Sequence, residues 1–326
     1  MASSSTADAN AAPSPPTNTT KPYLHGYHAS VLRSHSSRTA QNSCPHLLPY
    51  LRPGMRVLDV GCGPGTITTD LAAIIASPSS PSPSSTSTTS TTGHITALDA
   101  SPTVLATARA HAETTGTKNI DFRLGDACAL PFADASFDAV HANQVVQHVA
   151  DPVAAVREMR RVVRADGGVV ALREGDGHVW FCPPTTTRRR GTQEEGGEEG
   201  GEEEENPGDV LAEWYELWLR MARDAGVEPM AGRRLLSYAL RAGWAPDEVQ
   251  AGVGSQCWAG REELREWCGM WADRVVLSEF ADNAVGRGYA TREGLERLAG
   301  AWRAFAEVEG AWYGMMQGEA ILTRRG

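Results

Sequence analysis

The 326-residue chain has no uninterrupted apolar run of about 18 residues, the length that a transmembrane helix requires. Its first twenty residues contain no Lys, no Arg and no apolar core segment. This stretch is therefore typical neither of a secretory signal peptide nor of an Arg-rich transit peptide. We expect residues 1–20 to form a disordered tail, and we expect a cytoplasmic protein with no membrane partner.

Cysteine pairs at CxxC spacing and a concentrated basic face are also missing. None of the six cysteines has a partner at CxxC spacing, and no His, Cys or carboxylate group has metal-ligand spacing, so we expect reduced thiols and no metal.

The formal net charge is -10, and eight Glu lie in residues 194–205. No basic face indicates a nucleic-acid partner. The run of three Arg at 188–190 either neutralises part of the acidic run or acts as a nuclear signal.

Two low-complexity stretches interrupt a regular pattern of apolar segments. One is the Ser/Thr/Pro-rich stretch at residues 77–92, and the other is residues 182–208, which contain a Gly/Glu run. Neither can bury apolar area, so we predict flexible insertions there. Elsewhere short apolar strands alternate with helices, which predicts a parallel sheet covered on both faces. The predicted strands are 56–61, 94–100, 120–127, 137–144 and 167–176, and the predicted helices are 66–76, 102–113 and 152–164.

The C-terminal part has a different composition, rich in Trp and Arg. It predicts helices at 209–225, 232–242, 261–282 and 291–308, and two closing strands at 247–258 and 311–324. Its Trp residues either pack a core and lid or line a pocket for a flat substrate. We predict one α/β domain over residues 21–326, with a Rossmann-like, doubly wound, mostly parallel seven-stranded sheet and a helical cap around 209–310.

The segment "RVLDVGCGPGTIT" (residues 56–68) places three glycines between a strand and a helix. A doubly wound sheet binds nucleotide-like ligands at this position, and glycine lets backbone N–H groups reach them. A tight turn without a ligand is the alternative. The spacing is GxGxG rather than the dinucleotide pattern GxGxxG. In addition, Asp59 would repel a pyrophosphate and suit a cationic sulfonium, so both features favour S-adenosylmethionine over NAD and disfavour a dehydrogenase.

The stretch "VLDVGCGPG" resembles the glycine motif of class I S-adenosylmethionine-dependent methyltransferases. Three further stretches resemble motifs of that family: "ALDAS", "GDACALPF" and "FDAVHANQVVQHVADP". The resemblance covers residues 50–176. Its nearest subgroup is similar to the ubiquinone and menaquinone biosynthesis methyltransferases, including fungal small-molecule enzymes.

The resemblance implies a set of cofactor-binding residues. Asp99 would bind the ribose hydroxyls, and Asp126 would either contact the adenine or cap a turn. The strand end at Asn143 and Gln144 would lie beside the methionine portion. The full set is Asp59, Gly61, Cys62, Gly63, Gly65, Asp99, Ala100, Ser101, Asp126, Ala127, Asn143, Gln144, Tyr27 and Arg33.

Residues 23–40 are rich in Tyr and His, and form either a lid over the cofactor or a solvated amphipathic helix. As lid residues, Tyr27 and Arg33 would approach the cofactor, and either Arg33 or Arg38 would pair with the methionine carboxylate. His148 follows the fourth strand and is either a catalytic proton acceptor or a packing residue. His141, inside that strand, is predicted to be structural.

These features predict a methyltransferase that moves a methyl group to O, N or C of a small, aromatic or apolar molecule by in-line displacement. One alternative is a quinone-ring C-methyltransferase. Another is a catalytically silent subunit that binds S-adenosylmethionine and regulates a partner. We expect a monomer or a homodimer.

Overall fold

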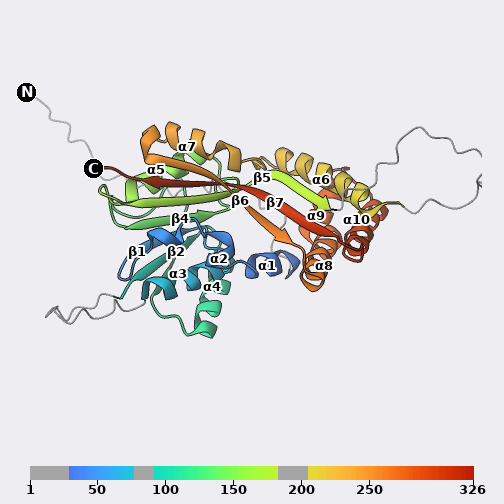
Figure 1. Cartoon of the computed structure of the whole chain (residues 1–326), viewed down its shortest axis with the longest axis horizontal. Coiled ribbons are helices and arrows are strands. Elements are labelled where there is room, and N and C mark those ends of the chain that lie inside the picture. The colour runs from blue at the N-terminus through green and yellow to red at the C-terminus, as the bar shows by residue number, and fades with distance from the viewer. Residues whose placement is uncertain (1–28, 77–91, 183–204) are drawn as a thin grey trace, which may run out of the picture.

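A seven-stranded sheet organises the part of the chain that the computed structural model describes, residues 29–76, 92–182 and 205–326 (Figure 1). The strand order is β3-β2-β1-β4-β5-β7-β6, and all strands run in one direction except β7. The predicted doubly wound sheet is confirmed. The strands are β1 (Arg56–Val60), β2 (His94–Asp99), β3 (Ile120–Leu124), β4 (Ala139–Asn143), β5 (Val169–Cys182), β6 (Val249–Trp258) and β7 (Trp312–Thr323).

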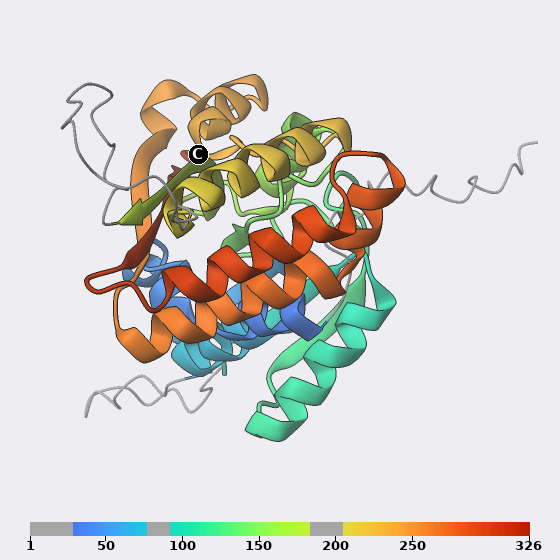
Figure 2. The ribbon, with the colours of Figure 1, turned by 90° about the vertical axis from the view of Figure 1, so that its right-hand side faces the viewer.

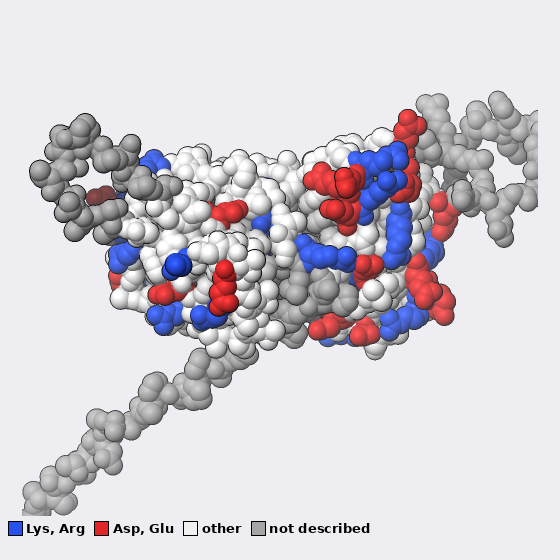
Figure 3. Space-filling model, turned by 90° about the horizontal axis from the view of Figure 1, so that it is seen from below, with Lys and Arg blue, Asp and Glu red and all other residues white. Residues whose placement is uncertain are grey.

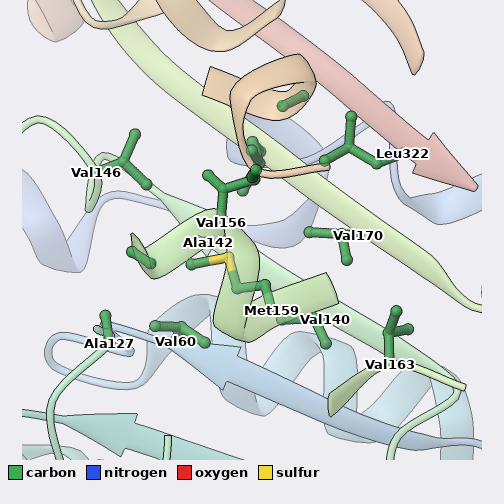
Figure 4. Close-up of a cluster of buried hydrophobic side chains, with 14 of the residues drawn as sticks. Val60, Ala127, Val140, Ala142, Val146, Val156, Met159, Val163, Val170 and Leu322 are labelled. Atoms are coloured by element: carbon green, nitrogen blue, oxygen red, sulfur yellow. The ribbon is translucent and has the colours of Figure 1, made fainter. Parts of the chain in front are cut away.

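Helices cover both faces of the sheet because buried strand residues alternate between those faces. On one face, Val156 and Met159 of α5 pack on Val140 of β4 and its neighbours (Figure 4). On the other face, Leu71 of α3 packs with Val57 of β1. The helices are α1 (Ala29–Ser36), α2 (Ala40–Ser43), α3 (Thr66–Ala76), α4 (Pro102–Thr115), α5 (Pro152–Val162), α6 (Pro207–Asp224), α7 (Leu235–Arg241), α8 (Arg261–Leu277), α9 (Glu279–Gly286) and α10 (Arg292–Phe305), with 3-10 turns at Leu48–Tyr50, Gly232–Arg234 and Pro246–Glu248.

Strands β5, β6 and β7 are longer than the others and extend into a helical cap formed by α6, α8, α9 and α10 (Figure 1). Figure 2 looks onto this cap and shows α8 and α10 side by side. A separate hydrophobic core fills the cap, and Trp214, Trp302 and Tyr313 are among its fully buried side chains. Acidic and basic side chains intermix over the cap surface (Figure 3). The cap is thus a second packed layer, joined to the sheet by continuous strands.

Several element boundaries differ from the prediction. β5 continues to Cys182 rather than ending at 176, and its pairing with β7 is irregular between Gly175 and Val179. The predicted helix 261–282 is divided at Ser278, whose backbone is extended and whose hydroxyl accepts a hydrogen bond from the Phe280 N–H to start α9. Pro207, expected in a flexible insertion, begins α6.

Several predictions concern residues that the structure does not describe. The N-terminal tail lies entirely outside the described residues, and so do residues 77–91 and 183–204, which make up most of the two predicted insertions. That residues 21–326 form one domain stays a prediction. Within residues 29–76, 92–182 and 205–326, no helix is both long and apolar enough to cross a bilayer.

Candidate active site

The glycine turn between β1 and α3 forms one wall of a cavity of about 270 Å³ at the carboxyl ends of the parallel strands. Gly61 has a φ of +66°, and a Cβ there would lie 2.5 Å from Cγ2 of Val145, so no side chain fits. At Gly63 (φ +57°) nothing lies within 4 Å of the position of a Cβ. The bare backbone of Gly63 therefore faces open space, as a turn that admits a ligand requires.

Most of the predicted cofactor residues line this cavity, although they come from four separate segments. Gly65 does not line it, because it packs against Ala108 of α4, where a Cβ would lie 3.1 Å from the Ala108 Cβ. Tyr27 lies outside the described residues. The predicted residues that line the cavity are Asp59, Gly61, Cys62, Gly63, Asp99, Ala100, Ser101, Asp126, Ala127, Asn143, Gln144 and His148.

Asp99, the last residue of β2, is held by two backbone hydrogen bonds. Its Oδ2 accepts from the Gly63 N–H at 3.1 Å, and its Oδ1 accepts from the Ser101 N–H at 2.9 Å. Burial raises the pKa of the Asp99 carboxyl above its ordinary value, although these N–H groups act in the opposite direction. Ser101 caps α4 through its hydroxyl. The carboxylate is thus oriented before any ligand binds, with further lone pairs available for a hydroxyl donor.

Asp59 is buried and fully engaged within the protein. Its Oδ1 lies 2.8 Å from Nδ1 of His141 on β4, and its Oδ2 accepts a hydrogen bond from the Thr68 hydroxyl at 2.5 Å. Burial lowers the pKa of His141, but Cys44 and Asp59 outweigh that effect and raise it to about 10. The imidazolium thus neutralises the carboxylate. Sequence reasoning did not identify this pairing, because nothing in the spacing of two strand residues indicates that they share a register position.

The loop after β4 is held in place by a buried carboxylate that the sequence did not reveal. Oε1 of Glu174 accepts from the N–H groups of Val145 and Val146 at 2.7 and 2.9 Å, and Oε2 accepts from the Gln147 N–H at 3.4 Å. Burial raises the pKa of Glu174 to about 7, although these hydrogen bonds oppose the shift. The loop carries His148, so Glu174 determines where that ring lies.

The end of β4 and the segment between α1 and α2 also supply polar groups to the cavity. Asn143 is buried, and its Oδ1 has no hydrogen-bond partner among the described residues, so it can accept from a ligand. Arg38 lines the cavity, and its Nη2 donates to Oε1 of Gln144 at 2.6 Å. Gln144 itself has a φ of +55°. Of the two arginines predicted to pair with the methionine carboxylate, Arg38 is the one that lines the cavity.

Arg33 does not lie at the cavity. It is on α1, its side chain is more than half exposed, and its Nη2 donates to Oδ2 of Asp273 on α8 at 2.6 Å. Asp273 also pairs with Arg303. The structure thus places Arg33 in a surface ion-pair cluster on the cap, and the prediction that it contacts the cofactor is not supported by its position.

Asp126 caps a turn, which is one of its two predicted roles, and its contact with adenine stays a prediction. Its Oδ1 accepts from the Cys128 N–H at 2.8 Å, as a turn-capping residue does, and the residue also lines the cavity. Cys62 lines it too, and burial raises the pKa of the Cys62 thiol. In the described part of the chain no group of three or more His, Cys, Asp or Glu side chains could hold a metal ion.

A second, smaller cavity of about 130 Å³ adjoins the first on the side of the cap. Its walls include Trp and Tyr side chains from α6, β6, α8 and β7. Four residues line both cavities: His35, Arg38, Gln144 and His148. These four side chains are therefore part of the walls of both cavities.

The first cavity fits an adenosyl sulfonium. An oriented carboxylate suits ribose hydroxyls, the bare Gly63 backbone permits close approach, and the Asn143 oxygen can receive the donors of an ammonium group. Arg38 can pair with a carboxylate at the same end. These groups are what an amino acid joined to a nucleoside requires, and no pyrophosphate site is needed to explain them.

The chain is similar in sequence to known methyltransferases. Residues 51–189 match the family model for a methyltransferase domain. The chain is similar to an uncharacterized methyltransferase of Schizosaccharomyces pombe, with 27% identity over 93% of this chain and 96% of that protein. It is also similar to a demethylmenaquinone methyltransferase of Staphylococcus aureus, with 34% identity over 37% of this chain and 44% of that protein. Among solved structures, the YcgJ protein of Bacillus subtilis shares 17% identity and a TM-score of 0.48, covering 86% of this chain and 99% of that one.

Proposed function

Because the chain belongs to the class I S-adenosylmethionine-dependent methyltransferases, we propose that it methylates an O, N or C atom of a small aromatic or apolar molecule. S-adenosylmethionine is its cofactor and supplies the activated methyl group when bound. The single observation that carries the proposed acceptor is the aromatic cavity that shares four lining residues with the cofactor cavity. An acceptor there would lie beside the donor, as an in-line transfer requires.

Different residues of the first cavity hold different parts of the cofactor. Asp99 binds the ribose hydroxyls, while Asp126 and Ala127 lie where they would contact the adenine. Asn143 and Arg38 bind the amino-acid end. The paired Asp59 and His141 leave the cavity floor without a net charge. That neutrality suits the reaction, because a strong anion beside the sulfonium would stabilise the ground state more than the less charged transition state.

His148 is the proposed proton acceptor because it lines both cavities and is carried by the loop that Glu174 holds. When the acceptor is a neutral hydroxyl or amine, its proton must leave as the methyl group arrives. The imidazole would take that proton. The surrounding aromatic side chains exclude water from the path of transfer.

The proposal is tested by measuring methyl transfer from labelled S-adenosylmethionine to a panel of phenols, amines and quinols. We expect transfer to at least one single-ring acceptor. His148→Ala should lower kcat by about 10²–10⁴-fold at saturating acceptor and saturating cofactor. His111→Ala is the matched control, because His111 lies on α4 next to Thr69 and lines neither cavity. Unchanged kcat in His148→Ala would remove the assigned role.

Two alternatives have their own outcomes in this assay. Transfer confined to quinol ring carbon would favour the quinone-ring C-methyltransferase. The similar Staphylococcus aureus protein is named a demethylmenaquinone methyltransferase. Cofactor binding without transfer to any class of acceptor would favour a silent regulatory subunit. Either result would replace the broader proposal.

A further inference from the structure

The loop of residues 144–148, which follows β4, begins in an unfavourable backbone conformation. Its first residue, Gln144, has a φ of +55° although it is not a glycine. A side chain in this left-handed region costs free energy, so such a conformation persists only where the surroundings hold it. The N–H of Gln144 donates to the Arg173 carbonyl at 2.7 Å, which fixes the start of the loop against β5.

Glu174 holds the next three residues of the loop. Its carboxylate accepts hydrogen bonds from the consecutive N–H groups of Val145, Val146 and Gln147. Glu174 is 0% exposed, and it is not among the described residues that line either cavity. Hydrogen bonds to an ionised acceptor are stronger than neutral ones. The loop is therefore held in one position by a buried group outside both cavities.

Two contacts transmit the position of this loop to the first cavity. The Val145 side chain packs against the glycine turn so closely that a Cβ on Gly61 would lie 2.5 Å from its Cγ2. The Gln144 side chain accepts from Nη2 of Arg38 at 2.6 Å. All four of these residues line the first cavity. A displacement of the loop would therefore change both the glycine turn and the place of the Arg38 guanidinium.

We infer that Glu174 is a positioning residue for the cofactor, because its ionised carboxylate holds residues 144–148 in the place where the first cavity binds S-adenosylmethionine. The affinity for the cofactor consequently depends on pH, although Glu174 does not line the cavity. This inference rests on the proposed assignment of the first cavity to the cofactor. It goes further by giving a residue outside that cavity control over the affinity.

The protonation state of Glu174 matters because only donors face it from the loop. An ionised carboxylate only accepts hydrogen bonds, whereas a protonated one also carries an O–H donor. Three N–H groups point at its two oxygens, so an added proton competes with them. Burial raises the pKa of Glu174 to about 7, although these N–H groups and Arg38 oppose the shift. The ionised fraction therefore rises from about one tenth at pH 6 to about nine tenths at pH 8.

Other titratable groups lie near Glu174 or in the cavity. Arg38 and Tyr238 of α7 interact electrostatically with Glu174. Neither changes charge between pH 6 and pH 8, because arginine stays protonated and burial raises the pKa of Tyr238 above its ordinary value. His35 and His148 line the cavity, and imidazoles do titrate in this range. Glu174→Gln leaves both imidazoles in place, so it separates their contribution from that of Glu174.

The test measures the affinity of the full chain for S-adenosylhomocysteine by calorimetry at pH 6, 7 and 8. We expect wild type to bind at least about fivefold more tightly at pH 8 than at pH 6, in step with the ionised fraction of Glu174. Glu174→Gln should bind at least about fivefold more weakly than wild type at pH 8, because its neutral amide turns an N–H₂ group toward the loop donors. Its affinity should vary by less than about twofold over the same range.

Glu248→Gln is the matched control, because Glu248 is also a buried carboxylate that accepts from backbone N–H groups. It is 7% exposed and accepts from Ala245 at 2.8 Å and from Arg325 at 2.9 Å. It is not among the described residues that line either cavity. This variant should keep the affinity of wild type at each pH, and therefore the same pH dependence.

An affinity of wild type that does not change between pH 6 and pH 8 would overturn the inference. A Glu174→Gln variant that binds weakly but keeps the pH dependence of wild type would also overturn it, because Glu174 would then have only a structural role. In both cases the cofactor still binds, so the proposed function stands. Absence of S-adenosylhomocysteine binding by wild type would instead remove the cofactor assignment, and this inference with it.

Discussion

The two cavities lie side by side, but they are built from different parts of the chain. The cofactor cavity is made of backbone, small residues and carboxylates that are already hydrogen-bonded, such as Asp99. The aromatic cavity is made of large side chains from the cap, such as Trp258 and Trp267. Where backbone atoms form a site, its ligand specificity depends on the conformation of the turn. Where side chains form a site, its specificity changes when those residues are substituted. The cofactor therefore follows from the fold, and the acceptor follows from particular residues.

The largest effect on stability is expected at the buried ion pair between Asp59 of β1 and His141 of β4. His141→Ala leaves Asp59 without its ionic partner in a buried position, and breaking such a pair costs about 3–5 kcal/mol. Chemical denaturation of the full chain measures the free energy of unfolding. His94→Ala is the control, because His94 is partly exposed and faces Asp121 at the surface. A loss below about 1 kcal/mol would show that the pair does not stabilise this lobe.

The second prediction concerns the loop that divides the two cavities. Because the pKa of Glu174 is raised from 4.5 to about 7, the folded state binds the proton more tightly than the unfolded state. The resulting stabilisation is complete below about pH 4.5 and is lost as the pH rises through about 7. The stability of wild type relative to Glu174→Gln should therefore fall by about 2–3 kcal/mol between about pH 5 and pH 8.

This difference is read from denaturation curves at several pH values. Glu113→Gln serves as the control, because Glu113 is exposed on α4 and its substitution should give a difference that does not vary with pH. A difference for Glu174→Gln that stays constant across the range would contradict the raised pKa.

The smallest of these effects is expected on the affinity for the cofactor. Asp99→Ala should weaken binding of S-adenosylhomocysteine by about 1–3 kcal/mol, the range for losing hydrogen bonds to a charged group. Calorimetric titration measures it. Asp121→Ala on the neighbouring strand is exposed and should bind as wild type does. An unaffected Asp99→Ala would refute the ribose assignment and weaken the distinction between the two cavities.

The sequence predicted the fold closely because strand and helix patterns are local. The helix Thr66–Ala76 was predicted closely, since an apolar strand, a glycine turn and a helical pattern follow one another within 21 residues, 56–76. The break at Ser278 was missed because Ser inside a helical pattern is unremarkable until its hydroxyl caps a new helix. The extension of β5 was missed because its partner β7 lies more than a hundred residues later.

The lining of the first cavity was predictable where a local motif carries the residue, as at Gly63 and Asp99. It was not predictable where groups meet across the fold. Glu174 holds a loop about thirty residues earlier in the chain, and the choice of Arg38 over Arg33 depends on how α1 lies against α8. Such contacts depend on long-range packing, for which no spacing rule exists.

The four side chains shared by the two cavities have a thermodynamic consequence. If one ligand rearranges His35, Arg38, Gln144 or His148, the affinity for the other ligand changes as well. If the cofactor tightens acceptor binding by some factor, the acceptor must tighten cofactor binding by the same factor. Titrations of either ligand alone would then underestimate both affinities, and the dissociation constants relevant to turnover are those of the ternary complex.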